Sequence, residues 1–258
     1  MSTAELVLNV AGISKRFGGL QALTDISMRI ERGQVYGLIG PNGAGKTTFF
    51  NVITGLYTPD SGSFELAGQP YEPTEVHLVA QAGIARTFQN IRLFAEMTAL
   101  ENVMVGRHVR TGSGLLGAIF RTKKFMAEEA AIAQRAHELL DYVGISAFAD
   151  YKARTLSYGD QRRLEIARAL ATDPQLIALD EPAAGMNTTE KTQLRALIDK
   201  IRNDHRTVLL IEHDVKLVMG LCDRVTVLDD GKVIAEGTPA DVQRNPHVID
   251  AYLGTGGH

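Results

Sequence analysis

The sequence predicts an α/β fold with a mainly parallel sheet, an antiparallel β subdomain and an inserted helical subdomain. Runs 35–39, 176–179 and 208–211 are apolar on successive residues, as in a parallel sheet covered on both faces. The early strands and the run 232–236 alternate more between apolar and polar residues and adjoin polar turns, which indicates antiparallel hairpins. The stretch from about 90 to 155 has few strand signals and interrupts the alternation of strands and helices.

Taken along the chain, short apolar runs predict strands and helical periodicity predicts helices. The predicted strands cover residues 6–10, 26–30, 35–39, 176–179, 208–211, 225–228 and 232–236. The predicted helices cover residues 127–142, 158–171, 189–203 and 214–220; in the third, Leu194, Leu197, Ile198 and Ile201 share one face. These elements predict a single domain with a core at 1–89 and 156–240, a helical insertion at 90–155 and a C-terminal helical tail at 241–258.

The segment 40–48 follows the strand at 35–39 and precedes an apolar run that can start a helix. Its residues are Gly40, Pro41, Asn42, Gly43, Ala44, Gly45, Lys46, Thr47 and Thr48, which fit the phosphate-binding pattern G-x-x-x-x-G-K-[ST]. Glycines let the backbone amides turn toward phosphate oxygens, and the helix start adds a partial positive charge. We expect Lys46 to reach the β- and γ-phosphates of a nucleotide and the Thr47 hydroxyl to bind Mg²⁺.

Two adjacent acids, Asp180 and Glu181, follow the apolar run 176–179. An acid at the carboxyl end of a parallel strand faces the crevice where ligands bind. We expect Asp180 to hold Mg²⁺ through water, and Glu181 to orient or deprotonate the water that attacks the γ-phosphate. Acidic pairs are also common in turns, so the phosphate-binding loop upstream is what favours this role.

A second helix start lies at residues 157–160. Ser157 and Asp160 have the spacing of a capping box, which would suit any helix. With the flexible Gly159, the same start is also a candidate anion site. Because one chain does not usually aim two helix starts at one γ-phosphate, we expect Ser157, Tyr158, Gly159 and Asp160 to serve a nucleotide held by a facing subunit.

Three single residues are candidates whose alternatives are structural. Gln89 lies where the core gives way to the helical insertion and could contact Mg²⁺ or the attacking water, although a lone glutamine is more often surface filler. His213 follows the strand at 208–211 and could hydrogen-bond a γ-phosphate, although a lone histidine there is more often structural. Phe17 could stack on adenine; otherwise it is a core residue.

Composition and charge argue against several classes of protein. The 258 residues carry a net charge of -3, which disfavours a protein whose main task is binding a nucleic-acid backbone. The single cysteine, Cys222, rules out an internal disulfide and suits a reducing compartment. The N-terminus lacks a signal-peptide pattern, and no apolar run approaches the ~20 residues that cross a bilayer. We therefore expect a cytoplasmic protein that reaches any membrane through a partner.

In order, the phosphate-binding loop, Gln89, Leu-Ser-x-Gly, Asp-Glu-Pro and a histidine after a strand resemble the ATPase subunits of ATP-binding cassette (ABC) transporters. The resemblance covers nearly the whole chain and implies a P-loop NTPase fold with an ABC ATPase core. No N-K-x-D motif for guanine and no G-x-G-x-x-G motif is present. Within that family, the chain resembles the ATPases of branched-chain amino acid importers more closely still, on segments 83–90, 93–94, 97–98, 101–103, 156–159, 161–171 and 181–187.

The resemblance implies a subunit that binds and hydrolyses ATP, with Mg²⁺, to power import of branched-chain or related amino acids. Its implied partners are two transmembrane permease subunits, a second ATPase subunit of the same or a different chain and, indirectly, a periplasmic or extracellular solute-binding protein; no nucleic acid is expected. The implied location is the cytoplasmic face of the bacterial inner membrane. Gln89 and the helical insertion would carry the motion to the permease.

Two departures from the general ABC pattern bear on the facing site. Tyr158 and Asp160 replace the first glycine after the serine and the glutamine of Leu-Ser-Gly-Gly-Gln, and Asp160 brings a negative charge near a phosphate site. If the Asp160 side chain turns into the helix cap, the cost is small; if it faces the nucleotide, the opposing site would be weakened. Asn187 stands where many family members have aspartate, which keeps hydrogen bonding but loses a charge.

Several alternatives stay open at this point. One is the ATPase of a related ABC system that imports urea or short amides, or exports lipopolysaccharide. A soluble ABC ATPase of DNA repair or ribosomes is disfavoured, because the chain has no long coiled-coil insertion, tandem cassette or basic stripe. A non-hydrolytic regulatory subunit is disfavoured by the intact Lys46, Asp180, Glu181 and His213. The short apolar run 115–120 could lie on a membrane surface, but its length favours packing within the protein or against a permease.

Overall fold

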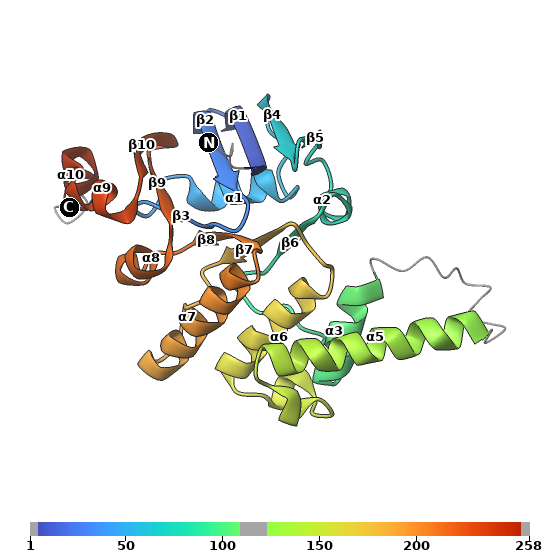
Figure 1. Ribbon diagram of the computed structural model, residues 1–258. Coiled ribbons are helices and arrows are strands. Elements are labelled where there is room, and N and C mark those ends of the chain that lie inside the picture. The colour runs from blue at the N-terminus through green and yellow to red at the C-terminus, as the bar shows by residue number, and fades with distance from the viewer. Residues whose placement is uncertain (1–4, 109–122, 254–258) are drawn as a thin grey trace.

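Two β-sheets form the body of the computed structural model, which describes residues 5–108 and 123–253 (Figure 1). The strands are β1 (Leu6–Phe17), β2 (Leu20–Glu31), β3 (Val35–Ile39), β4 (Ser61–Leu66), β5 (Gln69–Pro70), β6 (Ile84–Arg86), β7 (Leu176–Asp180), β8 (Thr207–Ile211), β9 (Arg224–Asp229) and β10 (Lys232–Gly237). One sheet has the strand order β10-β9-β3-β8-β7-β6, and the other has the order β2-β1-β4-β5. The apolar run 115–120 lies outside the described residues.

Helices cover both faces of the larger sheet. They are α1 (Lys46–Ile53), α2 (Val76–Ala82), α3 (Ala99–His108), α5 (Lys123–Tyr142), α6 (Tyr158–Leu170), α7 (Thr188–Asn203), α8 (Val215–Leu221), α9 (Pro239–Arg244) and α10 (Pro246–Leu253), with short 3-10 turns at Ser146–Phe148 and Ala153–Thr155. Helix α1 lies between the two sheets, whereas α7 and the group α3, α5 and α6 lie below the larger sheet (Figure 1). Within residues 5–108 and 123–253, no helix is both long and apolar enough to cross a membrane.

The larger sheet is parallel except at one edge, where β10 pairs antiparallel with β9. Its strands β3, β7 and β8 are buried at every position. Along β7, Leu176 and Ala178 pack toward α1 and the smaller sheet, whereas Ile177 and Leu179 pack toward the helices below. This confirms the predicted parallel sheet, because a strand covered on both faces reads as a continuous apolar run.

The smaller sheet is antiparallel throughout, which confirms the predicted fold class together with the parallel sheet and the helices. Strands β1 and β2 extend well beyond the predicted 6–10 and 26–30. The pairing of β1 with β2 shifts register on both sides of Ile13, and Gly12 there has φ 67°. Such irregularities break the alternation of apolar and polar residues that sequence reasoning depends on.

Helices α3, α5 and α6 pack on one another (Figure 1) through buried side chains such as Val103, Ala136 and Leu164. A capping box starts α3: Thr98 Oγ1 accepts from the Glu101 amide at 3.1 Å, and Glu101 Oε2 accepts from the Thr98 amide at 2.8 Å. Because α6 packs with α3 and α5, the helical layer continues past residue 155 to the end of α6.

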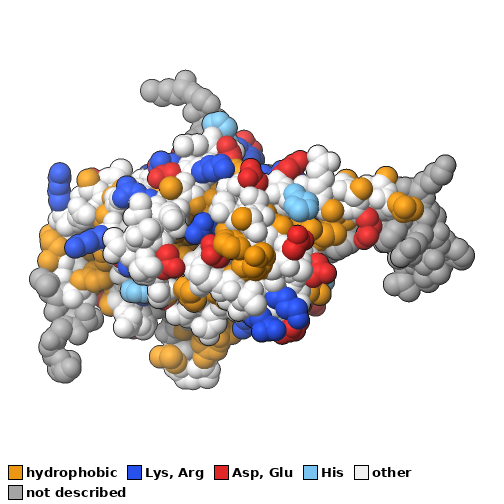
Figure 2. Space-filling view, turned by 90° about the horizontal axis from the view of Figure 1, so that it is seen from below, with side chains coloured by type: hydrophobic (Ala, Val, Ile, Leu, Met, Phe, Trp, Pro, Cys, Tyr) orange, Lys and Arg blue, Asp and Glu red, His pale blue; other side chains and the backbone are white. Residues whose placement is uncertain are grey.

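Seen from below, the molecule shows Lys and Arg side chains interspersed with Asp and Glu (Figure 2). Ion pairs between residues three apart also form within single helices. Arg135 lies 3.1 Å from Glu138 on α5, and Arg163 lies 3.2 Å from Asp160 on α6. Opposite charges thus compensate one another locally on the helical layer.

Candidate active site

Residues 40–45 form the loop between β3 and α1, residues 46–48 begin α1, and the conformation at the start of the loop requires glycine. Gly40 has φ 151°, and a Cβ there would lie 2.1 Å from the carbonyl oxygen of Leu228. Gly45, with φ 96°, is the N-cap of α1. The first amides of a helix have no carbonyl partner inside it, so the start of α1 directs N–H groups into the loop. The loop and the start of α1 therefore form a candidate anion site made of backbone amides.

Lys46, the first residue of α1, returns its side chain over this loop. Its Nζ donates to the carbonyl oxygens of Gly40 at 2.7 Å and Pro41 at 2.9 Å. Burial lowers the pKa of Lys46, and the nearby charge of Glu181 opposes this shift. An ammonium group has three donors, so two loop carbonyls leave one for an anionic ligand.

A hollow of about 320 Å³ opens over the loop. It is lined by Phe17, Leu20, Gln21, Ala22, Asn42, Gly43, Ala44, Gly45, Lys46, Thr47, Thr48, Glu181, Asp230 and Gly231. The Phe17 side chain is 41% exposed, and its ring meets Tyr57 edge to face at 5.1 Å between centroids. Phe17 is therefore not a core residue, and its ring stands at the mouth of the hollow. Residues 157–160 do not line it.

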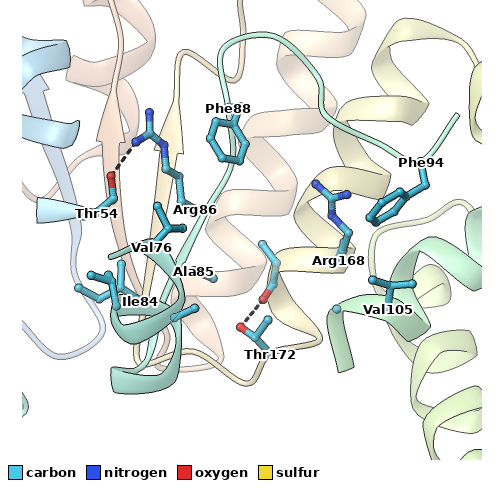
Figure 3. Close-up of a pocket in the computed structure, with 14 residues that line it drawn as sticks. Thr54, Val76, Ile84, Ala85, Arg86, Phe88, Phe94, Val105, Arg168 and Thr172 are labelled. Carbon is cyan, nitrogen blue, oxygen red and sulfur yellow. Dashed lines mark hydrogen bonds between the residues drawn. The ribbon is translucent and has the colours of Figure 1, made fainter. Parts of the chain in front are cut away.

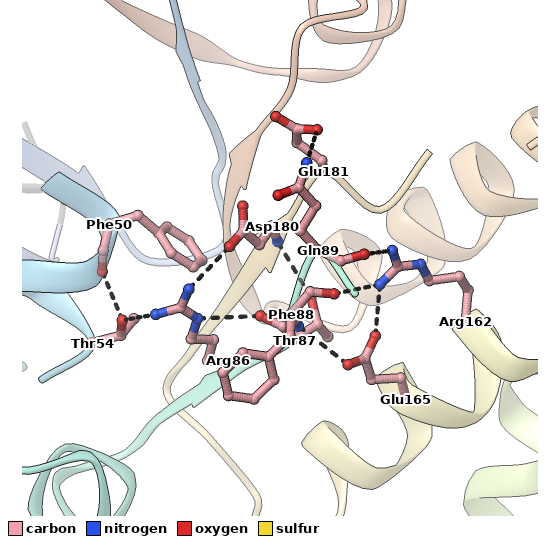
Figure 4. A network of polar contacts seen from close by, with 10 residues as sticks. All are labelled: Phe50, Thr54, Arg86, Thr87, Phe88, Gln89, Arg162, Glu165, Asp180 and Glu181. Carbon is pink, nitrogen blue, oxygen red and sulfur yellow. Dashed lines mark hydrogen bonds and ion pairs between the residues drawn. The ribbon is translucent and has the colours of Figure 1, made fainter. Parts of the chain in front are cut away.

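Glu181 also lines this hollow, and two polar side chains contact its carboxylate. Gln89 Nε2 donates to Glu181 Oε2 at 2.9 Å (Figure 4), and His213 Nδ1 lies 3.5 Å from the same oxygen. Glu181 has φ 44°, in the left-handed region that non-glycine residues avoid. Such strain gathers at functional sites, where the surroundings hold a side chain in a required direction. The structure thus brings together three residues that are 32 to 124 positions apart in the chain by their numbering.

Asp180, the last residue of β7, is paired with Arg86 in the interior (Figure 4). Arg86 Nη2 lies 3.0 Å from Asp180 Oδ2, and the two side chains are 9% and 7% exposed. Arg86 also donates to Thr54 Oγ1 at 2.6 Å, and its guanidinium lies 4.6 and 4.9 Å from the ring centroids of Phe50 and Phe88. Burial raises the pKa of Asp180, and the charge of Arg86 opposes the rise.

Arg86 and Glu212 are polar residues of the site that sequence reasoning missed. Glu212 is fully buried and accepts from the amides of Ala183 at 2.8 Å and His213 at 3.2 Å. It thereby joins the segment after Glu181 to the segment that carries His213. Burial raises the pKa of the Glu212 carboxyl. Their positions in the sequence could have indicated them, because each lies within three residues of a residue that the motifs single out.

Ser157 caps the start of α6, but only half of the predicted capping box forms, because the Asp160 carboxylate accepts from the Ser157 hydroxyl instead of the Ser157 amide. Ser157 Oγ accepts from the Asp160 amide at 3.2 Å and donates to Asp160 Oδ2 at 2.6 Å. The other carboxylate oxygen of Asp160 lies 3.2 Å from Arg163 Nη2. The negative charge is therefore directed into the helix cap and partly compensated. The Tyr158 ring is half exposed beside it.

Gly159 and Asn187 meet at Glu190, which joins the starts of α6 and α7. A Cβ at Gly159 would lie 2.8 Å from Glu190 Oε1. Asn187 is the N-cap of α7: its Oδ1 accepts from the Glu190 amide at 3.0 Å, and Glu190 Oε2 accepts from the Asn187 amide at 2.9 Å. The amide side chain at position 187 therefore completes a helix cap without the charge of an aspartate.

A second hollow, of about 300 Å³, lies between the core and the helical layer (Figure 3). Its lining is mostly apolar and comes from α2, β6, α3, α6 and the segment between β6 and α3; it includes Val76, Val79, Ile84, Phe88, Phe94, Val105 and Ala169. Arg168 lines it from α6, with its guanidinium 5.8 Å from the Phe94 ring centroid. Phe88 connects this apolar groove to the active site, because it precedes Gln89 in the chain.

The model of the ABC transporter family matches residues 23–184, and the chain belongs to this family. A further family model, described as branched-chain amino acid ATP-binding cassette transporter, matches residues 232–258. The chain is 47% identical over 249 residues to the high-affinity branched-chain amino acid transport ATP-binding protein BraF of Pseudomonas aeruginosa, covering 96% of this chain and 98% of BraF. These findings confirm the resemblance that the motifs indicated.

Solved structures support the same assignment. The ADP conformation of MJ1267, an ATP-binding cassette of an ABC transporter, superposes with a TM-score of 0.84 at 34% identity, over 96% of this chain and 99% of that one. The dimeric structure of MJ0796, a bacterial ABC transporter cassette, gives 0.75 at 26% identity, over 90% and 98%. The chain is therefore an ATPase of the ATP-binding cassette class, a class in which dimeric cassettes occur.

Proposed function

We propose that this chain is the ATP-binding and ATP-hydrolysing subunit of an importer for branched-chain or related amino acids. The observation that carries the chemistry is the convergence of Gln89 and His213 on one oxygen of Glu181, at the rim of the loop that holds Lys46. The solute class is supported by the likeness to BraF and by the matching C-terminal family model.

ATP binds with its phosphates on the amides of residues 40–48 and with its adenine against the exposed ring of Phe17. The free donor of Lys46 serves the β- and γ-phosphates. Asn42, Thr47 and Thr48 line the same hollow and close it around the phosphate chain. The lining of the hollow allows ATP to bind in one orientation only, with its γ-phosphate toward Glu181.

Glu181 accepts a proton from the attacking water while the water oxygen bonds to the γ-phosphorus. The bond from that phosphorus to the bridging oxygen breaks, and ADP and phosphate form. Gln89 and His213 hold the Glu181 carboxylate from one side, which leaves its second oxygen for the water. Charged and polar groups fixed in this way need no rearrangement during the reaction.

Thr47, Asp180 and Gln89 are the residues that would hold Mg²⁺. Hydroxyl, carboxylate and amide oxygens suit this hard cation. When bound, the ion neutralises charge on the phosphates.

A second ATPase subunit, of the same or a different chain, completes each site with its own α6 start. Ser157, Tyr158, Gly159 and Asp160 do not line the hollow of their own chain, which leaves them for the nucleotide of the facing subunit. Because Asp160 is directed into the cap, its charge does not oppose the γ-phosphate. Loss of the γ-phosphate by hydrolysis lets the two subunits separate.

Two transmembrane permease subunits take up this motion, at the cytoplasmic face of the bacterial inner membrane. Their docking site is the apolar groove between the core and the helical layer, because Phe88 in its wall is the neighbour of Gln89. An amphipathic permease segment with an acidic residue fits this groove, since Arg168 lines it. The periplasmic or extracellular solute-binding protein acts on the permeases and does not contact this chain.

The test is to purify tagged Glu181→Gln protein from its native membranes, with ATP and Mg²⁺ present, and to identify what accompanies it. This variant keeps the nucleotide site but lacks the base, so the closed complex should accumulate. The expected result is two multi-spanning permeases that bind branched-chain amino acids together with their solute-binding protein. The control is the same variant washed without nucleotide, from which a second ATPase subunit should be lost.

Recovery with permeases specific for urea, amides or lipopolysaccharide would contradict the proposed solute and keep the transporter. Recovery only from the soluble fraction, with ribosomes or DNA-repair proteins, would refute the transporter as well.

A further inference from the structure

A buried ion pair on α6 contacts the segment that carries Gln89. Arg162 Nη1 lies 2.9 Å from Glu165 Oε2, and both side chains are 1% exposed (Figure 4). Neither residue lines the nucleotide hollow, and neither belongs to the motifs of the mechanism. Burial raises the pKa of Glu165, and the charge of Arg162 opposes the rise. The pair therefore lies in the interior for a reason other than contact with ATP.

The side chains of Arg162 and Glu165 hydrogen-bond to the backbone of Phe88 and Gln89. Arg162 Nη1 donates to the Phe88 carbonyl oxygen, and Nη2 donates to the Gln89 carbonyl oxygen. Glu165 Oε1 accepts from the Phe88 amide at 3.2 Å. Both polar groups of the Phe88 backbone and the carbonyl of Gln89 are thus held by a single turn of α6.

The same guanidinium reaches the exposed start of α6. Arg162 Nη2 donates to the Tyr158 hydroxyl at 3.1 Å. At the other end, the side chain of Gln89 donates to Glu181 at 2.9 Å. A continuous set of contacts therefore runs from Tyr158 through Arg162 and Gln89 to Glu181, all within one chain.

Stability alone does not explain this arrangement. A buried ion pair is often no more stabilising than well-packed apolar residues of the same volume, because both charges must leave water. What the pair offers is geometry, since the planar fork of arginine fixes two acceptors at once. Here the two acceptors are consecutive carbonyl groups, so the orientation of the Gln89 segment is set by the position of α6.

We propose that Arg162 and Glu165 couple the two ATP sites of a dimer. This inference rests on the proposed function, in which Gln89 and Glu181 serve the chain's own ATP while Ser157–Gly159 serve the ATP of the facing subunit. When the start of α6 closes on the facing γ-phosphate, the pair moves the Gln89 segment and so sets Glu181 in its own site. Arg162 and Glu165 are positioning residues, since neither touches the nucleotide.

The test compares the full-length wild-type protein with Arg162→Met. Three quantities are measured: the dependence of ATP hydrolysis on ATP concentration, the affinity for a fluorescent ATP analogue, and the thermal unfolding midpoint. For the wild type we expect cooperative hydrolysis, with a Hill coefficient that approaches about 2, because the dimer has two ATP sites. For the variant we expect a Hill coefficient of about 1 and a kcat lower by about 10- to 100-fold, with analogue affinity within about twofold.

A matched control is Arg135→Met, because Arg135 and Glu138 form the same i,i+3 pair on α5 with side chains 34% and 50% exposed. This control should keep the wild-type Hill coefficient and kcat. Arg162→Met leaves Glu165 buried without a partner and could unfold the protein. The double variant Arg162→Met, Glu165→Met removes both charges, and we expect it to fold, to bind the analogue and still to hydrolyse ATP without cooperativity.

Cooperative hydrolysis at the wild-type rate in the folded double variant would overturn the coupling. Non-cooperative hydrolysis by the wild type would overturn it as well and leave the proposed function standing. The proposed function itself would fail on a different result, namely a wild-type protein that does not hydrolyse ATP and whose Glu181→Gln form stays monomeric with ATP.

Discussion

Replacing Arg86 with methionine should destabilise the protein strongly, because it leaves Asp180 buried without a counter-charge. Arg86 and Asp180 are 9% and 7% exposed, with 3.0 Å between Nη2 and Oδ2. Methionine can occupy the space between the Phe50 and Phe88 rings, where the guanidinium now lies. The substitution therefore removes mainly the charge and the hydrogen bonds, including the one to Thr54 Oγ1 at 2.6 Å.

Removing one partner of a buried ion pair costs about 3–5 kcal/mol, because the remaining charge has lost its water and its partner. We expect a loss of that size in the free energy of unfolding at pH 8. In urea this corresponds to a midpoint lower by about 1–2 M. The sequence has no Trp, so circular dichroism at increasing urea is a suitable measurement.

The loss in the free energy of unfolding of Arg86→Met should depend on pH in a known direction. Burial raises the pKa of Asp180 even with Arg86 present, and without Arg86 the pKa in the folded variant rises further. An acid with a raised folded pKa binds more protons folded than unfolded, so the free energy of unfolding falls as pH rises from about 4, the ordinary pKa of aspartic acid. The deficit of Arg86→Met relative to wild type should therefore be smaller at pH 5 than at pH 8.

The matched control is again Arg135→Met, which removes exposed ion pairs to Glu138 and Asp173 that are worth about 0–1 kcal/mol each. A loss in Arg86→Met no larger than in the control would refute the assignment of Asp180 and Arg86 as a buried charged pair. A large deficit that is the same at pH 5 and pH 8 would show that packing, rather than the orphaned carboxylate, is responsible.

Two further predictions concern the loop and the cysteine. Lys46→Ala should weaken binding of a fluorescent ATP analogue by about tenfold or more, because it removes the ammonium from the phosphate site; unchanged affinity would contradict the assignment of residues 40–48. Cys222 is 7% exposed, and burial raises the pKa of its thiol to about 12. At pH 8 the folded protein should react with a disulfide reagent on the order of 1,000-fold more slowly than the unfolded protein, and rapid reaction of the folded form would disprove this burial.

Much of the fold was predictable because its signals are local. The apolar runs at 35–39, 176–179 and 208–211 match β3, β7 and β8 to within one residue, because burial on both faces excludes charged side chains along these runs. The sequence did not predict α3 as a separate helix, because its apolar face is weak and its start depends on the Thr98 and Glu101 cap. The full lengths of β1 and β2 were missed because their register shifts interrupt the periodicity.

The sequence by itself determined the loop at 40–48, since glycines and a helix start act over a few neighbouring residues. It also indicated Glu181, Gln89 and His213 as candidates. Tertiary structure alone decided which groups they meet. Arg86 binds Asp180 across 94 positions, and Arg162 binds the carbonyl of Phe88 across 74. Contacts at such separations depend on how sheets and helices pack, and local sequence patterns do not predict that packing.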